Sequence, residues 1–152
     1  MNVLKPVSTI MTKQLVTVVE DATLKEVSDI FKEKNIHHIP VVRYKSIVGI
    51  VSRTDFDKFI HGKPHGTDKG DDLIRNTRLN TWKAKDIMTK GLAKIDSKEP
   101  IRTVLGIFKM NRFHALPIVD NDELVGIVTT LDIITALADE PIKLEDYETA
   151  KP

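Results

Sequence analysis

The chain has 152 residues and a formal net charge of +1, a length that allows one domain or two very small ones around a buried core. Because 23 basic residues are balanced by 22 acidic ones, the composition argues against nucleic-acid binding through a large basic surface. The absence of cysteine excludes disulfides, thiolate metal sites and thiol catalysis, and no apolar run approaches the length of a membrane span or a secretory signal. We therefore expect a cytoplasmic protein that binds neither nucleic acid nor membrane.

The first predicted elements are a short strand and an amphipathic helix. Residues 16–19 predict the strand. Thr23 and Glu26 then have the spacing of a helix capping box. The apolar residues that follow at helical spacing are Leu24, Val27, Ile30 and Phe31.

A hairpin and a second helix are expected next. Two apolar runs, residues 37–42 and 46–51, flank a short polar turn, which indicates paired strands. Pro40 must lie at a strand start or edge, because proline donates no hydrogen bond to a ladder. The second helix opens at Ser52 and carries the apolar residues Phe56, Phe59 and Ile60. The unit is therefore β-α-β-β-α.

The segment after this unit is predicted to be a loop. Residues 61–72 are rich in Gly, Asp and Lys and poor in apolar side chains. His61 and His65 have the spacing H-x3-H, but no obvious third ligand is nearby, so we interpret them as loop residues and expect no metal site.

The same order of elements then recurs 77 residues later. Residues 10–57 align with 87–134 without a gap, and about 17 of these 48 positions are identical, which indicates a duplication. Pro100 opens the corresponding helix, where its missing N–H is harmless. Each unit alone is marginal in size, so we expect two pseudo-twofold halves with a cleft along their join. The predicted boundaries are 7–60 for the first domain, 61–81 for a linker, 82–138 for the second domain and 139–152 for a polar tail.

One repeated phrase has two interpretations. It reads GIVSRTD at 49–55 and GIVTTLD at 126–132. A hydroxyl at the N-cap and a carboxylate three residues later form a helix-capping pattern. A helix start also offers free N–H groups to a phosphate, and a carboxylate there can accept both hydroxyls of a ribose. Both interpretations are compatible with the same geometry.

The two units, from IMTK through HHIPVV and SIVGIVSRTD and again from IMTK through HALPIV and ELVGIVTTLD, resemble a tandem pair of CBS domains. The resemblance covers about residues 7–60 and 82–138 and implies an α/β (α+β) fold, in which two pseudo-symmetric β-α-β-β-α CBS repeats are packed as one CBS-pair module. It further implies a regulatory module that binds an adenosyl ligand (AMP, ADP, ATP or S-adenosylmethionine) in the cleft between the repeats. It also implies a homodimer.

The resemblance assigns ligand contacts to matching positions of this chain. The Ser/Thr and Asp of the repeated phrase lie near the ribose, and the segment before the proline of the other repeat frames the adenine or reaches the phosphates. One expected site combines Ser52 and Asp55 with Phe113, His114, Ala115 and Pro117. Its symmetric twin combines Thr129 and Asp132 with Ile36, His37, His38 and Pro40.

Two other classes of function remain as alternatives. A structural dimerisation module would bind no ligand. A nucleotide-processing enzyme would use Asp55 and Asp132 as acid and base, but no nucleophile with a base, Gly-rich phosphate loop or metal-ligand cluster accompanies them. We therefore expect no catalytic residues and no required cofactor, only an adenine nucleotide or S-adenosylmethionine as regulatory ligand. The module would act through an unknown effector protein or its own dimer.

Overall fold

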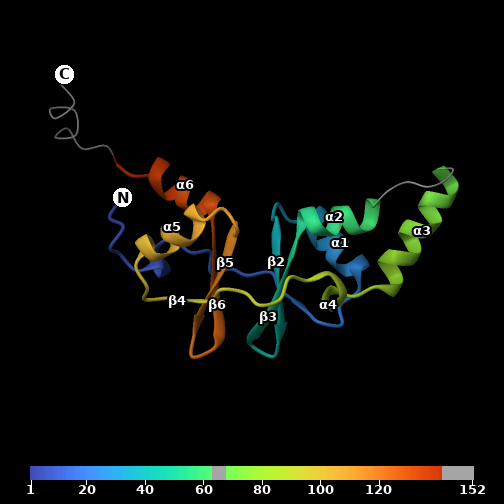
Figure 1. Cartoon of the computed structure of the whole chain (residues 1–152), viewed down its shortest axis with the longest axis horizontal. Coiled ribbons are helices and arrows are strands. Elements are labelled where there is room, and N and C mark those ends of the chain that lie inside the picture. Colours follow the sequence, from blue (N-terminus) through green and yellow to red (C-terminus); the bar gives the residue numbers. More distant parts are fainter. Residues whose placement is uncertain (63–67, 142–152) are drawn as a thin grey trace, which may run out of the picture.

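The structure is a computed structural model and describes residues 1–62 and 68–141. It is a mixed α/β fold with two three-stranded sheets, one in each repeat (Figure 1). The predicted fold class is confirmed. The elements are the 3-10 helix η1 (Val7–Thr9), β1 (Val18–Val19), α1 (Leu24–Glu33), β2 (His38–Arg43), β3 (Ser46–Ser52), α2 (Arg53–His61), α3 (Asp68–Thr81), α4 (Ala84–Ile87), β4 (Ile95–Asp96), α5 (Ile101–Lys109), β5 (Ala115–Asp120), β6 (Glu123–Thr129) and α6 (Thr130–Ala138).

Each sheet combines one short parallel strand with an antiparallel hairpin. β1 pairs in parallel with β2, β2 pairs antiparallel with β3, and β4, β5 and β6 repeat this arrangement. Pro40 and Pro117 lie inside the central strands, opposite Ile50 and Ile127. The short strands pair only with residues after each proline, so on that side the prolines are at the sheet edge, as their missing N–H requires.

Each repeat buries its own hydrophobic core between its sheet and its helices. The predicted helix of the first repeat has the expected capping box between Thr23 and Glu26 and buries the apolar face formed by Leu24, Val27 and Phe31. The second core contains Ile95, Ile101, Val104, Leu116, Ile118, Val128 and Ile133. Apolar burial of this kind is the main source of stability for each half.

The segment that leads into each repeat packs on the other repeat. We call residues 6–13 the first leader segment and residues 82–90 the second. Thr12 of the first leader exchanges backbone hydrogen bonds of 2.9 and 3.0 Å with Ile127 of the second repeat. Thr89 of the second leader exchanges bonds of 3.1 and 2.9 Å with Ile50 of the first repeat. The two halves are therefore joined by an exchange of equivalent segments.

The methionines of the repeated IMTK phrase pack over the glycines of the repeated VGIV phrase. A Cβ atom placed on Gly126 would lie 2.5 Å from Sδ of Met11. A Cβ atom placed on Gly49 would lie 2.7 Å from Cγ of Met88. Glycine thus allows the leader to approach the sheet closely, which explains why both phrases recur together.

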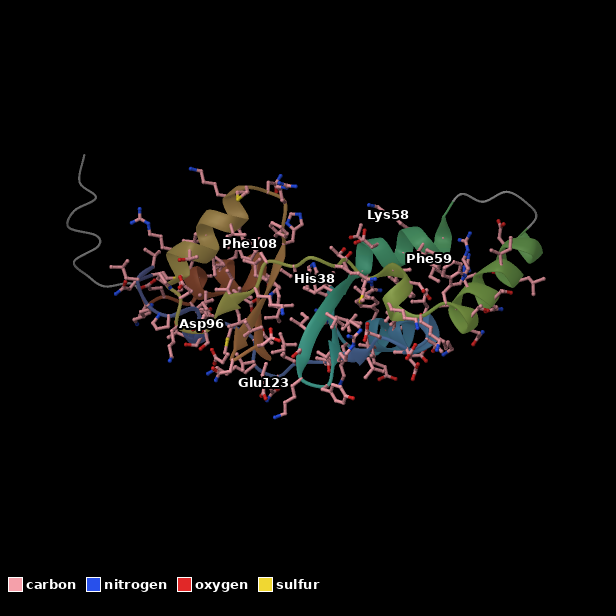
Figure 2. The ribbon with its side chains drawn as sticks, turned by 60° about the horizontal axis from the view of Figure 1, so that its bottom comes forward. His38, Lys58, Phe59, Asp96, Phe108 and Glu123 are labelled. Atoms are coloured by element: carbon pink, nitrogen blue, oxygen red, sulfur yellow. The ribbon has the colours of Figure 1, made fainter. Side chains whose placement is uncertain are left out.

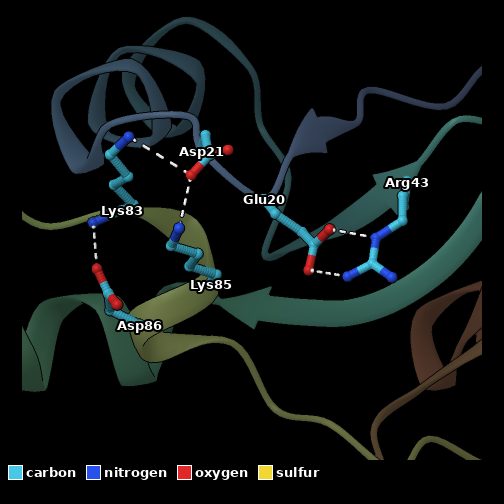
Figure 3. Close-up of polar contacts among 6 residues, drawn as sticks. All are labelled: Glu20, Asp21, Arg43, Lys83, Lys85 and Asp86. Carbon is cyan, nitrogen blue, oxygen red and sulfur yellow. Dashed lines mark hydrogen bonds and ion pairs between the residues drawn. The ribbon is translucent and has the colours of Figure 1, made fainter.

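Ion pairs fix the second leader to the first repeat (Figure 3). Nζ of Lys85 lies 2.7 Å and Nζ of Lys83 lies 3.4 Å from Oδ1 of Asp21. The hydrogen bond from Lys85 is the main reason that the pKa of Asp21 is lowered. Beside them, the Arg43 guanidinium donates two hydrogen bonds, of 2.7 and 3.0 Å, to Glu20 and lowers the pKa of that carboxyl.

The two hairpins lie side by side in the middle of the molecule, with the helices on the outer sides (Figure 1). The backbone N–H of Leu124 in β6 donates to the carbonyl of Lys45 at 2.9 Å. Asp122 accepts from the hydroxyl of Ser46 at 3.2 Å and from Nζ of Lys94 at 2.9 Å. The bonds from Leu124 to Lys45 and from Ser46 to Asp122 connect the hairpin turns across the junction, whereas Lys94 belongs to the same repeat as Asp122.

The prediction of a loop over residues 61–72 is wrong at its first residue, because His61 ends α2, and in its last part, because α3 begins at Asp68. Residues 63–67, which include His65, lie outside the described residues, as do residues 142–152 of the predicted tail. α3 contacts α1 and α2, and Nη1 of Arg78 donates to the carbonyl of Phe59 at 2.7 Å. Its few apolar residues gave no helical periodicity, so packing on the first repeat, rather than local pattern, supports this helix.

Candidate ligand site

Both copies of the repeated phrase form the beginning of a helix. Ser52 is the N-cap of α2, and its hydroxyl accepts from the N–H of Asp55 at 3.1 Å. Thr129 is the N-cap of α6, and its hydroxyl accepts from the N–H of Asp132 at 3.3 Å. The capping interpretation is therefore confirmed for both copies. It does not exclude a ligand, since capping occupies only part of each carboxylate.

The two carboxylates are held differently. Oδ2 of Asp132 accepts from both the N–H and the hydroxyl of Thr129, each at 2.6 Å. Its Oδ1 accepts from the hydroxyl of Thr12 at 3.1 Å, across the exchanged leader segment. Asp55 accepts a hydrogen bond from the Ser52 hydroxyl at 2.7 Å. Asp132 is thus fixed by both repeats, whereas Asp55 is held within its own.

A cavity of about 300 Å³ opens beside Asp132. Residues 35–38 of the first repeat and residues 127 and 129–132 of the second line it, so both repeats form its wall. Its volume is at the small end of the range of about 300–1,000 Å³ that is usual for ligand pockets. The lining residues are Thr12, Asn35, Ile36, His37, His38, His114, Ile127, Thr129, Thr130, Leu131 and Asp132.

The structure brings most of the second predicted site together in this cavity. Thr129 and Asp132 line it with Ile36, His37 and His38. Pro40 is buried within β2 and is not among the lining residues.

The residues of the first predicted site lie in several places in the structure, and the site stays a prediction. His114 was grouped with Ser52 and Asp55, but it lines the cavity beside Asp132. Ala115 and Pro117 are buried in β5. Phe113 packs partly buried against the core of the second repeat. Ser52 and Asp55 stay at the start of α2.

Sequence reasoning missed five lining residues: Thr12, Asn35, Ile127, Thr130 and Leu131. A signal for Thr12 was present, because IMTK occurs in both repeats. What the repeat did not show is that the first leader crosses to the second repeat. Ile127, Thr130 and Leu131 lie within the repeated phrase, but none of them belongs to its repeated pair of hydroxyl and carboxylate.

Three histidines, His37, His38 and His114, line the cavity together with Asp132. His38 is half-buried near the junction of the two halves (Figure 2). Burial lowers the pKa of His38, and the nearby His37 and His114 lower it further, while Asp55 opposes them. His38 therefore senses groups of both repeats, and it is held mainly neutral at neutral pH.

No lysine or arginine is among the residues that line this cavity. Arg53 is close in sequence to the first predicted site. Its Nη1 donates to the carbonyl of Phe31 at 2.9 Å, and its guanidinium lies over the Phe31 ring, 5.7 Å from the ring centroid. Over residues 1–62 and 68–141, no three His, Asp or Glu side chains gather closely enough to hold a metal ion.

The comparisons with known proteins agree with this architecture. The sequence profile of the CBS domain matches residues 7–62 and 84–139. The chain therefore belongs to the CBS domain family, as a tandem pair.

Curated relatives are longer proteins. An uncharacterized protein of Methanocaldococcus jannaschii is 34% identical over 145 residues, which are 92% of this chain and 48% of that protein. Homoserine O-acetyltransferase of Methanohalobium evestigatum is 31% identical, over 84% of this chain and 23% of the enzyme. The chain thus spans less than half the length of these relatives.

Solved structures of CBS-domain pairs have the same fold. The CBS domain pair of protein MJ0100, in complex with 5′-methylthioadenosine and S-adenosyl-L-methionine, has a TM-score of 0.69 and 25% identity, covering 89% of this chain and 97% of that one. CBSX2 in complex with AMP has a TM-score of 0.70 and 22% identity, covering 88% of this chain and 96% of that one. These neighbours bind adenosyl ligands.

Proposed function

We propose that the chain is a regulatory module that binds an adenosyl ligand in the cavity beside Asp132. The observation that carries the proposal is this cavity. Its wall combines the Asp132 carboxylate, at the start of α6 in the second repeat, with residues 35–38 of the first repeat. A ligand that contacts both walls would stabilise one arrangement of the two repeats. Binding would thus be transmitted as a change in how the halves are held.

The chemistry of the cavity suits a nucleoside. Asp132 accepts three hydrogen bonds, two at Oδ2 and one at Oδ1, and a carboxylate has about four lone-pair sites, so Oδ1 keeps acceptor capacity for one ribose hydroxyl. Ile36, Ile127 and Leu131 supply apolar surface for a base. The adenosyl ligands of the MJ0100 domain pair support the choice of adenine.

No catalytic role is proposed. Asp132 and Asp55 each serve as the N3 residue of a helix start, and no lysine, arginine or serine accompanies Asp132 in the cavity lining. The relatives named as enzymes are much longer than this chain, so their activities are not transferred to it.

Calorimetry and thermal-shift measurements with adenosine, 5′-methylthioadenosine, S-adenosylmethionine, AMP and ATP test the proposal. We expect at least one of them to bind and to raise the melting temperature in a concentration-dependent way, because it binds only the folded state. Binding of none would contradict the proposal and favour a structural module. Turnover of AMP or ATP would instead favour the enzyme.

We also propose that the module forms a homodimer. α6 exposes Leu131, Ile134 and Leu137, whose exposed fractions are 64%, 60% and 52%. Such a row on one helix is typical of an interaction surface. Light scattering at tens of micromolar, with and without ligand, should give twice the monomer mass. A monomer under both conditions would contradict dimerisation while leaving ligand binding intact.

A further inference from the structure

The duplication places different charges at equivalent positions of the two expected sites. Asn35 and Thr130 line the cavity beside Asp132. The residues 77 positions away in the other repeat are Arg112 and Arg53. The two neutral side chains Asn35 and Thr130 thus correspond to arginines in the other repeat.

The cavity has little to neutralise a phosphate chain. Within residues 1–62 and 68–141, its lining has one ionisable acid, Asp132, three histidines as bases, and no lysine or arginine. His38, the most buried of these imidazoles, has a pKa lowered by burial and by its two histidine neighbours, with Asp55 acting in the opposite sense. Charge-assisted hydrogen bonds from arginine or lysine are the usual means of holding phosphate.

We propose that the cavity beside Asp132 selects adenosyl ligands whose 5′ group carries no negative charge, such as a nucleoside or its thioether, over adenosine triphosphate. The small volume of about 300 Å³ points the same way. The proposal rests on the adenosyl-binding function above and names its ligand class. It also gives a reason for the differences between Asn35 and Arg112 and between Thr130 and Arg53 in the two repeats.

A competition experiment on the full chain tests the selection. 5′-Methylthioadenosine is bound first, and adenosine or ATP is then titrated in at pH 8, where histidines are neutral. Adenosine should displace it at concentrations at least tenfold lower than ATP does. Displacement by ATP at equal or lower concentration would overturn the proposal. If AMP or ATP binds but neither 5′-methylthioadenosine nor adenosine does, the selection is overturned while the proposed function stands. If none of these ligands binds, the proposed function itself fails.

A charge-introducing variant gives the sharper test. Asn35→Arg installs in the cavity the residue that the other repeat carries at 112, and Asn35 is exposed, so the fold should tolerate it. The preference for adenosine over ATP should fall at least tenfold, and the change should shrink as salt is raised.

The matched control is Asn76→Arg, the same substitution at an exposed position on α3. It changes the net charge equally but should leave the preference within about twofold of the wild type, because surface charges far from a site are screened. An unchanged preference in N35R, with a wild-type melting temperature, would show that charge at the cavity does not select the ligand. An equal shift in N76R would attribute the selection to net charge alone.

Discussion

The two repeats differ in what surrounds the same carboxylate. Asp132 receives three hydrogen bonds, two from Thr129 and one from Thr12 of the exchanged leader. In the first repeat the carboxylate of Asp55 is held by Ser52. The repeated phrase therefore determines the helix start in both halves, while residues contributed by the other half determine how the carboxylate is presented. Local sequence is duplicated, but the environment is not.

The outer helices differ in the same way. In the first repeat, α3 packs on α2. The rings of Phe59 and Trp82 meet edge to face, with their centroids 5.2 Å apart. In the second repeat, the equivalent helix α6 keeps Ile134 and Leu137 exposed. The first repeat thus has α3 packed on α2, whereas the apolar residues Ile134 and Leu137 of α6 are exposed. Any association between copies should therefore depend on the second repeat.

The largest expected effect is on ligand affinity, which should depend on Asp132 much more than on Asp55. Asp132→Asn removes a charged acceptor that faces the cavity, and each hydrogen bond to a charged group is worth about 1.5–3 kcal/mol. Calorimetry with adenosine should show a loss of affinity of about ten- to a hundredfold. The loss of stability should be only a few tenths to about 1 kcal/mol, as for a helix-dipole charge.

Asp55→Asn is the matched control at the equivalent position. It should change affinity for the cavity much less, because Asp55 does not line it. Equal losses of adenosine affinity in both variants would show that the two carboxylates do not differ in their role, and would indicate that the two sites act as one. Unchanged affinity in the double variant would leave both residues as helix caps only.

The next effect tests the close approach of the leaders. Gly49→Ala should destabilise the fold by about 1–3 kcal/mol through overpacking, because the new Cβ meets Sδ of Met88 and also, at 2.7 and 3.0 Å, its Cγ and Cβ near the backbone. Gly126→Ala should cost less, since the atoms that it meets, Sδ, Cγ and Cε of Met11 at 2.5, 3.0 and 3.2 Å, are nearer the end of a flexible side chain. Urea unfolding measures both. A penalty for G49A that is the same in a Met88→Ala background would contradict the contact.

A smaller effect compares the two leader threonines. Thr12→Val removes the hydroxyl that donates to Asp132 and should cost about 0.5–1.5 kcal/mol. Thr89→Val makes the same isosteric change at the equivalent position, where no side-chain hydrogen bond is found among the described residues. It should lie within about 0.5 kcal/mol of the wild type. Equal changes in chemical denaturation would show that the Thr12 contact contributes nothing.

Much of this fold was predictable because its signals are local. The capping box at Thr23, the helix starts at Ser52 and Thr129, and the hairpins all follow from residue types at short spacing. The duplication then doubled each signal.

What could not be predicted depends on which repeat a segment contacts. An internal repeat shows that IMTK recurs but not that each copy packs on the opposite half, so Thr12 was missed as a cavity residue. α3 was missed because tertiary contacts, rather than its own periodicity, support it.

The smallest expected effect concerns His38, whose counterpart in the second repeat is the buried Ala115. The pKa of His38 is lowered in the folded chain by burial, and His37 and His114 add to this against Asp55. The unfolded chain therefore binds a proton more readily than the folded one, so this histidine reduces stability as the pH falls below the ordinary histidine value of about 6.5. His38→Gln should flatten the decline of melting temperature between pH 7.5 and 5.5, whereas His61→Gln, at an exposed position on α2, should not. If the melting temperatures of wild type and H38Q decline in parallel, the protonation of His38 is not coupled to folding, and the difference between the two repeats at this position is one of size alone.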